Sequence, residues 1–409
     1  MIPAQAVILV GGRGTRLGAL TRSTPKPLLE VGGRPFLDWL IEEVARHGIP
    51  RITLLAGFEA ERFAPYRDRT LRGARIEVLT EPEPLGTAGA LRLFRDRLAP
   101  HFLLLNGDTL FDVNLLRLPG AWRAGTLGVL ALRREAPGAR YGTVALGTDG
   151  AVAGFAPRPA DGIARGPING GVYLLDRAIV ERIAPGPVSL EAGVFPALAA
   201  EGRLRGVGFD GCFLDIGMPE DYAAAQAAIP AMARRPAVFL DRDGVLIEDT
   251  GHPHRPEEAR WIPGAAAAIA ALNDAGCFVF VVTNQAGVAR GLYPEAQIGA
   301  MHRWMAEELA RHGAHVDAFE YCPYHPEAPL PEWRRDSRRR KPAPGMIEDL
   351  LAAWPVDLPR SLLVGDRGTD IEAARRAGLP GHLFAGGDLH GFIAGLPGSP
   401  LSVAGTTRA

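Results

Sequence analysis

The hydrophobic pattern of this chain alternates short apolar runs with longer stretches of helical periodicity. In the first half, apolar runs at 6–10, 51–56 and 102–105 are separated by amphipathic stretches at 35–47 and 88–98. This alternation predicts strands joined by helices, which is the sequence signature of a sheet that contains parallel strands. The first half is therefore expected to be an α/β domain.

The pattern begins again after an alanine-rich segment. Met218–Ala233 has helical character but few anchoring residues, and it ends at Arg234-Arg235-Pro236. A new α/β series follows, with strands predicted at 237–240, 277–282 and 361–364 and helices predicted at 265–273 and 297–312. We therefore expect the two domains to meet near Arg235.

The length of 409 residues agrees with two large domains, since a domain commonly has 100 to 200 residues. We expect one domain over residues 1–230 and a second over residues 236–390. The segment 395–409 is rich in Gly, Pro, Ser and Thr and is expected to be a flexible tail.

Composition narrows the class of protein. A formal net charge of -1 provides no overall field for nucleic acid or a membrane, so neither is expected as a partner. Cys212, Cys277 and Cys322 lie far apart, which argues against a disulfide framework and favours the cytoplasm. The apolar run at 6–10 is too short for a secretion signal. Composition leaves the oligomeric state open.

Lysine is rare in this chain. Only Lys26 and Lys341 occur among 45 basic residues, and each adjoins a proline. A lysine ammonium is a compact donor on a flexible stem, unlike the planar guanidinium of arginine. Biased codon usage is the alternative explanation, but we interpret the two lysines as markers of two phosphate-binding sites.

The first lysine follows a glycine-rich loop. The apolar run at 6–10 leads into Gly11–Leu17, whose backbone N–H groups can surround a phosphate while Arg16 and Lys26 balance its charge. A structural turn is the alternative, and the spacing is not that of a dinucleotide or Walker loop. Asp108 adds a carboxylate after another predicted strand, where open α/β sheets bind ligands. These residues predict a nucleotide site.

The loop Gly11–Leu17, together with Pro25-Lys26-Pro27-Leu28, resembles the signature of the sugar-1-phosphate nucleotidyltransferases over roughly residues 1–230. Val10 departs from this signature, which usually has alanine there. The resemblance implies that Arg16 binds the triphosphate, that Lys26 binds the reacting phosphates, and that Asp108 and Asp215 hold Mg²⁺. A sugar phosphate would then attack the α-phosphorus of a nucleoside triphosphate and expel pyrophosphate, with no protein nucleophile.

The same resemblance implies further contacts with the two substrates. The residues expected to bind the nucleotide are Gly11, Gly12, Gly14, Thr15, Glu81, Gly86 and Thr87. The residues expected to bind the sugar are Asn169, Gly170 and Glu191, although a solvated helix position is the alternative for Glu191. The wording Leu-Gly-Thr-Ala-Gly at 85–89 resembles the guanylyl-transferring branch, which favours GTP.

Two carboxylates follow the predicted strand at 237–240. Asp241 and Asp243 are two positions apart, so an extended backbone turns both side chains to the same side. A plain turn or metal motif is the alternative. Later predicted strands end with further polar groups, namely Thr283, Asp366 and the nearby Asp370, and the second lysine, Lys341, lies between the strands that carry them. This ordered set predicts phosphate chemistry.

The set resembles the haloacid dehalogenase superfamily, in the branch of the heptose-bisphosphate and histidinol-phosphate phosphatases, over roughly residues 236–388. The resemblance implies a parallel sheet with a minimal cap, so that the chain has two Rossmann-like α/β domains, the first with a mixed sheet. It implies that Asp241 attacks phosphorus and that Asp243 acts as acid and then base. Its other implied contacts are Thr283 and Lys341 to the phosphoryl group, Asn284 and Arg340 to the substrate, and Asp241, Asp366 and the Asp243 carbonyl to Mg²⁺.

A departure from this branch concerns zinc, which its members often bind through a C-x-H pair and a later C-x-C pair. Cys322 is present here, but Tyr324, Ser337 and Arg339 stand at the other three positions. One thiolate cannot supply a site that needs four N or S ligands, so no zinc is expected. His325 is interpreted as a loop or core residue.

Two other features receive plain interpretations. The arginine-rich run 334–341 is short and the chain is near neutral, so we do not interpret it as a nucleic-acid site. Apart from Arg340 and Lys341, which have the roles given above, its residues are interpreted as a largely solvated loop. His252 and His254 lie in a proline-containing loop and are interpreted as solvated.

The two implied chemistries fit one pathway with small-molecule substrates. A phosphatase acting on D-glycero-D-manno-heptose 1,7-bisphosphate leaves a 1-phosphate, which the other domain would convert to GDP-heptose. An alternative is a nucleotidyltransferase for mannose or another hexose 1-phosphate, joined to a phosphatase of other specificity such as histidinol phosphate. A non-catalytic protein that senses nucleotide sugars is the alternative from another class.

Overall fold

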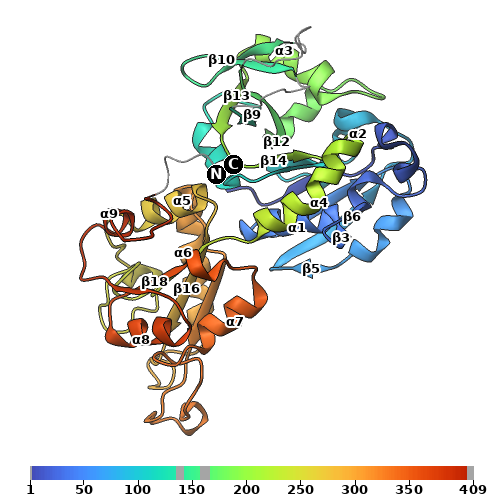
Figure 1. Ribbon diagram of the computed structural model, residues 1–409. Helices are drawn as coiled ribbons and strands as arrows, with labels where there is room; N and C mark the ends of the chain where they lie inside the picture. The colour runs from blue at the N-terminus through green and yellow to red at the C-terminus, as the bar shows by residue number, and fades with distance from the viewer. Residues whose placement is uncertain (1, 135–141, 157–165, 403–409) are drawn as a thin grey trace. The chain divides into compact units, whose positions relative to one another are not determined.

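The computed structural model describes residues 2–134, 142–156 and 166–402 (Figure 1). It confirms the expected α/β class. Contacts divide the chain between Met232 and Ala233 into two compact units, which are described separately. Of the predicted tail, residues 403–409 lie outside the described residues, whereas Leu396 and Leu401 pack against a hydrophobic core.

The first unit is built on a mixed sheet. Its strands are β1 (Ala6–Leu9), β4 (Arg51–Ala56), β5 (Thr70–Leu71), β6 (Ala74–Thr80), β7 (His101–Asn106), β9 (Gly128–Arg133), β10 (Thr143–Leu146), β11 (Val152–Ala156), β12 (Ile168–Asp176) and β13 (Leu204–Phe209). β1 pairs in parallel with β4 and β7, whereas β12 pairs antiparallel with β7 and β9. Two-stranded sheets join β2 (Glu30–Val31) to β3 (Arg34–Pro35) and β8 (Thr109–Phe111) to β14 (Phe213–Asp215).

Helices and short helical turns connect these strands. They include α1 (Phe36–Arg46), α2 (Gly86–Leu93), α3 (Phe195–Ala200), α4 (Pro219–Ala233), η1 (Thr15–Thr21), η2 (Lys26–Leu28), η4 (Arg95–Arg97) and η7 (Leu190–Val194). The amphipathic pattern at 35–47 forms α1, which buries Leu37, Leu40 and Val44 on one face. The pattern at 88–98 does not form one helix, because Phe94 leaves the helical conformation between α2 and η4.

The second unit is built on a five-stranded parallel sheet, as expected. Its strands, in spatial order, are β17 (Ala318–Cys322), β16 (Phe278–Asn284), β15 (Ala237–Leu240), β18 (Leu362–Gly365) and β19 (Gly381–Leu383). The helices are α5 (Ala265–Asp274), α6 (Ala296–Arg311), α7 (Gly345–Ala353), α8 (Gly368–Arg376) and α9 (Leu389–Ala394), with a short turn η8 (Pro256–Glu258).

The central strand β15 is buried on both faces. Val238 and Leu240 belong to one hydrophobic cluster, and Ala237 and Phe239 belong to another. This is why the strand reads as a continuous apolar run. Its carboxyl end, next to those of β16 and β18, is therefore the place where polar side chains can gather. Within the described residues, no helix combines the length and the apolar character needed to cross a membrane.

Candidate active sites

In the first unit, strand pairing brings together two carboxylates that are far apart in sequence. β8 and β14 pair with Asp215 opposite Thr109, and the Ile216 N–H donates to the Asp108 carbonyl at 3.0 Å. Lys26 Nζ lies 2.6 Å from Asp108 Oδ2 and 3.5 Å from Asp215 Oδ1. The structure thus places three predicted site residues in one cluster, with the lysine between the carboxylates.

This cluster has a donor set that suits Mg²⁺. Mg²⁺ is commonly bound by one or two carboxylates together with substrate phosphates. Asp108 and Asp215 supply two carboxylates, and Lys26 balances only one of their two negative charges. Asp108 and Asp215 would hold the ion, and the phosphates of a nucleotide would complete its ligands.

The glycine loop is anchored against the same lysine. Gly14 has φ of 59°, and a Cβ there would lie 3.1 Å from Lys26 Cβ, so a side chain would be both strained and crowded. Thr21 Oγ1 donates to the Gly14 carbonyl at 2.9 Å. Three other predicted residues of this loop, Gly12, Thr15 and Arg16, are exposed. The loop therefore has a fixed base and an accessible tip.

Glu81 lies directly against the start of this loop. A Cβ on Gly11 would lie 2.9 Å from Glu81 Oε1, so a side chain at this position would displace the Glu81 carboxylate. Glu81 Oε2 accepts from the Leu85 N–H at 3.1 Å. Burial raises the pKa of Glu81, and the bond from Leu85 opposes that rise. The structure thus brings together Gly11 and Glu81, which were both predicted to contact the nucleotide.

The predicted sugar residues form a second polar group, which includes one residue that sequence reasoning missed. Asn169 Nδ2 donates to the Tyr173 hydroxyl at 2.9 Å, and that hydroxyl donates to Glu191 Oε1 at 3.4 Å. Thr87 Oγ1 donates to Glu191 Oε2 at 3.1 Å. Glu191 is therefore engaged and not a solvated helix residue. Tyr173 shares a face of β12 with Asn169 at even spacing, which is the signal that could have identified it.

Two predicted glycines have packing roles. A Cβ on Gly170 would lie 2.4 Å from the ring of Phe111. Gly86 has φ of 70°, and a Cβ there would lie 2.6 Å from the Val188 carbonyl. Both positions therefore require glycine for close approach, whatever the ligand.

In the second unit, Lys341 is buried between two carboxylates. Its Nζ lies 2.9 Å from Asp241 Oδ1 and 2.7 Å from Asp370 Oδ1, and it donates to the Val282 carbonyl at 2.7 Å. Burial alone would lower the pKa of Lys341, but Asp241 and Asp370 outweigh it and raise the pKa. The lysine therefore stays charged beside the predicted nucleophile.

Three carboxylates converge at the same place. Oxygens of Asp241, Asp366 and Asp370 lie within 4.8 Å of one another. Burial, followed by the two neighbouring carboxylates, raises the pKa of Asp366 to about 6. Asp366 Oδ1 is buried without a hydrogen-bond partner among the described residues. An orphaned carboxylate oxygen beside two further carboxylates fits Mg²⁺. Asp370 joins Asp241 and Asp366, two of the three ligands predicted from sequence, whereas the side chain of Asp243 is not part of this carboxylate group.

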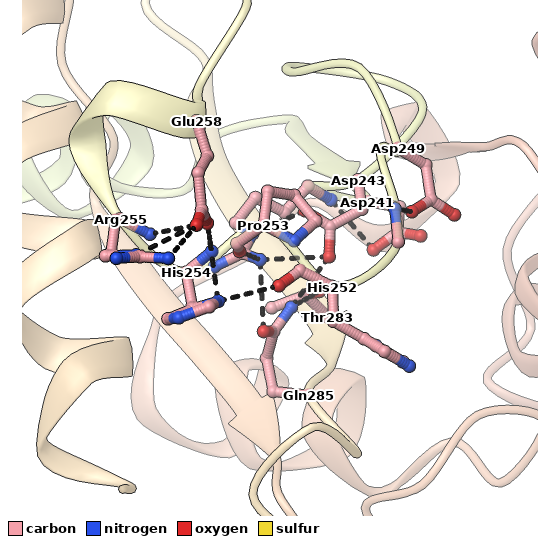
Figure 2. Close-up of polar contacts among 12 residues, drawn as sticks. Asp241, Asp243, Asp249, His252, Pro253, His254, Arg255, Glu258, Thr283 and Gln285 are labelled. Carbon is pink, nitrogen blue, oxygen red and sulfur yellow. Dashed lines mark hydrogen bonds and ion pairs between the residues drawn. The ribbon is translucent and has the colours of Figure 1, made fainter. Parts of the chain in front are cut away.

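Asp243, the predicted acid, accepts hydrogen bonds from two side chains, and Figure 2 labels Asp243 and one of them, Gln285. The other, Arg242, donates to both oxygens of Asp243, from Nε at 2.8 Å and from Nη2 at 3.0 Å. Gln285 Nε2 donates to Asp243 Oδ2 at 2.9 Å and to Thr283 Oγ1 at 2.9 Å. Burial raises the pKa of Asp243, and Arg242 opposes that rise. Arg242 and Gln285 were not predicted as site residues.

Asn284 and Arg340, both predicted to bind substrate, make contacts within the protein. Asn284 Nδ2 donates to the Lys341 carbonyl at 3.0 Å, and its Oδ1 accepts from the Lys341 N–H at 3.1 Å. These two bonds fix the backbone of Lys341. Arg340 Nη1 donates to the Tyr324 carbonyl at 3.2 Å, and burial lowers the pKa of Arg340.

Aromatic and cationic side chains hold the loop 322–339, in which Tyr324, Ser337 and Arg339 stand where related phosphatases often have zinc ligands. Tyr324 packs on Trp333 with ring centroids 5.4 Å apart, and the guanidinium of Arg335 lies 3.6 Å from the centre of the Tyr324 ring. Arg338 pairs with Asp349. The arginine-rich run is thus tied into its own unit, and Arg334, Arg335 and Arg338 are exposed, in agreement with the largely solvated loop that was expected.

The interpretation of His254 as solvated is wrong. Its ring stacks on Tyr293 with centroids 4.4 Å apart, and its Nδ1 lies 3.3 Å from Glu258 Oε2. His252 is half-buried, and its carbonyl lies 3.0 Å from His254 Nδ1. His325 Nδ1 accepts from the Glu327 N–H at 3.1 Å, in agreement with a loop role. Packing of Tyr293 against the loop accounts for the difference at His254.

Comparisons with known proteins agree with the two units. The nucleotidyl transferase family matches residues 5–231, and the HAD-hydrolase-like family matches residues 338–390. The D-glycero-beta-D-manno-heptose-1,7-bisphosphate 7-phosphatase of Rhodopseudomonas palustris is 50% identical over 160 residues, which are 39% of this chain and 89% of that protein. The mannose-1-phosphate guanyltransferase of Schizosaccharomyces pombe is 33% identical over 226 residues, 53% of this chain and 62% of that protein.

A solved structure resembles the first unit over its length. HddC from Yersinia pseudotuberculosis is 28% identical, with a TM-score of 0.50, and the match covers 56% of this chain and 99% of HddC. HddC has also been solved in complex with GMP-PN. The chain thus spans less than two thirds of the yeast guanyltransferase but nearly all of HddC and most of the bacterial phosphatase. It belongs to the nucleotidyl transferase family through its first unit and, through its second, to the HAD phosphatases related to that heptose-bisphosphate phosphatase.

Proposed function

We propose that this protein is a bifunctional enzyme of nucleotide-sugar synthesis. Its second unit removes the 7-phosphate of D-glycero-D-manno-heptose 1,7-bisphosphate, and its first unit transfers GMP from GTP to the resulting heptose 1-phosphate with release of pyrophosphate. The product of one reaction is the substrate of the other, which gives a chemical reason for the two units to share a chain.

The observation that carries the phosphatase half is the cluster of Asp241, Asp366, Asp370 and Lys341. Three converging carboxylates and one buried ammonium suit a dianionic phosphoryl group and a divalent cation. The substrate is supported by the 50% identity to a phosphatase that is named for this bisphosphate.

The residues of the second unit have distinct tasks in this proposal. An oxygen of Asp241 forms a bond to phosphorus while the bond from phosphorus to the sugar oxygen breaks, and Asp243 gives its proton to that oxygen. Asp243 then takes a proton from water, which attacks phosphorus and releases phosphate from Asp241. Thr283 and Lys341 hold the phosphoryl oxygens. Mg²⁺, when bound by the three carboxylates, neutralises charge on the phosphoryl group.

In the first unit, the protein positions two substrates and neutralises charge. Arg16 at the accessible loop tip contacts the triphosphate, while Lys26 turns from its carboxylate partners toward the phosphates at the reacting centre. Glu81 contacts the nucleoside, and Glu191 with Asn169 contacts the sugar. The bond from Thr87 to Glu191 joins the nucleotide side of the site to the sugar side.

The choice of GTP is supported by the similarity of the first unit to HddC, which has been solved with GMP-PN. The choice of heptose is supported by the similarity of the second unit to a heptose-bisphosphate phosphatase. A second candidate is transfer of GMP to mannose 1-phosphate, which the 33% identity to a yeast mannose-1-phosphate guanyltransferase favours. The two candidates differ only in the sugar.

A product assay tests the proposal. The purified chain is incubated with Mg²⁺, each anomer of heptose 1,7-bisphosphate and each nucleoside triphosphate in turn, and products are identified by mass. GDP-heptose with phosphate and pyrophosphate is expected. A parallel incubation contains mannose 1-phosphate in place of the bisphosphate. If heptose bisphosphate yields phosphate but no GDP-heptose, and mannose 1-phosphate yields GDP-mannose, the substrate of the first unit is mannose 1-phosphate. Ligand binding without any turnover would contradict both halves of the proposal.

A further inference from the structure

Arg242 is the largest side chain that is fully buried in the described part of the chain, although it stands between two catalytic candidates. Besides its two bonds to Asp243, its Nη2 donates to the Pro253 carbonyl at 2.7 Å and to Gln285 Oε1 at 3.0 Å. A buried arginine with this many acceptors is held in one orientation. Its fork in turn fixes the position of the Asp243 carboxylate.

The contacts continue from Arg242 toward the segment 252–258, of which Figure 2 labels His252, Pro253, His254, Arg255 and Glu258. Tyr293 donates its hydroxyl proton to Gln285 Oε1 at 2.8 Å, and its ring stacks on His254. His254 lies beside Glu258, and Glu258 Oε1 accepts from Arg255 Nε at 2.8 Å. Asp243 is thus joined through Arg242 and Gln285 to a segment that begins nine positions further along the chain.

We propose that Arg242 is a positioning residue that holds the Asp243 carboxylate where it can protonate the leaving oxygen, and that it uses the segment 252–258 as its support. The inference rests on the proposed phosphatase function. In this proposal the backbone of Asp243 does not place its carboxylate alone. The guanidinium of Arg242 also holds the carboxylate, and the orientation of that guanidinium depends on other parts of the unit.

This role has a chemical consequence that a merely structural role lacks. When the bond from phosphorus to the leaving oxygen breaks, the electron pair goes to that oxygen. A sugar alkoxide needs the proton of Asp243, whereas p-nitrophenolate is a stable leaving group that needs it little. Misplacing Asp243 therefore slows transfer from a sugar phosphate far more than transfer from p-nitrophenyl phosphate.

The test compares Arg242→Lys with the wild-type chain on both substrates, heptose 1,7-bisphosphate and p-nitrophenyl phosphate. The measured quantity is kcat/KM for each, because it reports the steps up to formation of the aspartyl-phosphate and excludes its later hydrolysis. Lysine keeps the charge but loses the fork. We expect kcat/KM for the sugar phosphate to fall about tenfold or more and that for p-nitrophenyl phosphate to fall less than about threefold.

Two further variants keep the test decisive. Arg235→Lys alters another buried arginine of the same unit, which lies near the Phe278 ring and is not bonded to Asp243, so it should leave the ratio of the two kcat/KM values unchanged. Tyr293→Phe removes one hydroxyl from the outer part of the network and should shift the ratio in the same direction as Arg242→Lys, by a smaller factor. It serves if Arg242→Lys does not fold.

The outcomes separate this inference from the proposed function. A selective loss on the sugar phosphate supports the positioning role. An unchanged ratio in folded Arg242→Lys overturns the positioning role. If Arg242→Lys is unfolded, an unchanged ratio in Tyr293→Phe overturns it. In both cases the phosphatase assignment stands, provided that Asp241→Asn is inactive. If Asp241→Asn is as active as the wild type on both substrates, the proposed function itself is wrong.

Discussion

Lys341 Nζ and Asp370 Oδ1 lie 2.7 Å apart, and both side chains are almost completely buried. Asp370 is the third residue of α8, and its Oδ2 also accepts from the Arg367 N–H at 3.0 Å. The carboxylate thus orients the lysine and also belongs to the group that fits Mg²⁺. Replacing Asp370 should therefore weaken Mg²⁺ binding and change the orientation of Lys341.

Asp370→Asn is expected to weaken Mg²⁺ binding about 10- to 100-fold, because one of three converging carboxylates is neutralised. Titration of phosphatase activity with Mg²⁺ measures the change. Asp388→Asn is the matched control, since Asp388 is an exposed cap of α9 and asparagine can replace it there. An Mg²⁺ dependence shared by Asp370→Asn and the wild type would remove Asp370 from the metal site.

The two activities should be separable by single substitutions. Asp241→Asn removes the predicted nucleophile and should lower phosphate release by several orders of magnitude, while pyrophosphate release from added sugar 1-phosphate persists. Asp108→Asn should have the opposite effect. Coupled assays for phosphate and pyrophosphate provide the measurement. Loss of both activities in either variant would contradict independent sites.

His302 should make the second unit sensitive to acid. Burial, followed by the charge of Arg242, lowers the pKa of His302 from 6.5 to about 3. The unfolded chain therefore takes up this proton first as the pH falls, so stability is lost from about pH 6.5 down to about pH 3. Between pH 7 and pH 5 the loss from this residue is about 2 kcal/mol.

Denaturant titrations at pH 7 and pH 5 test this expectation. His302→Phe retains a ring that can stack on Phe319, and it should lose less stability than the wild type over this range. His312→Gln alters an exposed histidine at the end of the same helix and should behave as the wild type does. Equal pH dependence in His302→Phe and the wild type would show that His302 is not the acid-sensitive group.

The purified protein should contain no stoichiometric zinc. Cys322 is fully buried, and Tyr324 stands where a second ligand would be needed. Contacts of the Tyr324 ring with Trp333 and with Arg335 hold the loop by other means. Elemental analysis and melting curves with and without a zinc chelator check this; one zinc per chain, or a chelator-dependent loss of several degrees, would contradict it.

The same contacts predict a modest effect of Arg335→Ala. The cation over the Tyr324 ring is worth about 0.5–1 kcal/mol at an exposed site, so a small fall in melting temperature is expected with phosphatase activity largely retained. Arg360→Ala is a matched control, because Arg360 is an exposed arginine on a separate turn. A loss in Arg335→Ala no larger than in Arg360→Ala would count against the contact.

Sequence reasoning located the second site because its signals are local. An apolar strand followed at once by Asp241 and Asp243 has a fixed geometry, since alternate residues of an extended chain point the same way. Asp370 was part of the same set, but no local signal indicated that it would lie beside Lys341 and in the metal site. It is one polar residue in the first turn of a helix, and its burial depends on how α8 packs beside β18.

Arg242 shows why the remaining contacts were missed. In sequence it is a charged residue between two aspartates, and nothing local distinguishes a solvated side chain from a buried one. Its orientation is decided by acceptors at Pro253 and Gln285, which reach it only in the folded chain. The same holds for Tyr173, whose hydroxyl bonds depend on the approach of η7 to β12.

The pairing of β8 with β14 has a consequence for the order in which the first unit is completed on the ribosome. β8 ends at Phe111 and its partner β14 begins at Phe213, so β8 can pair only after about one hundred further residues have been synthesised. At translation rates of roughly 5–20 residues per second, that is an interval of about 5 to 20 seconds. Through that time Asp108 lacks Asp215, and β8 lacks its partner strand. A nascent chain therefore acquires the two carboxylates of its first site only near the end of that unit.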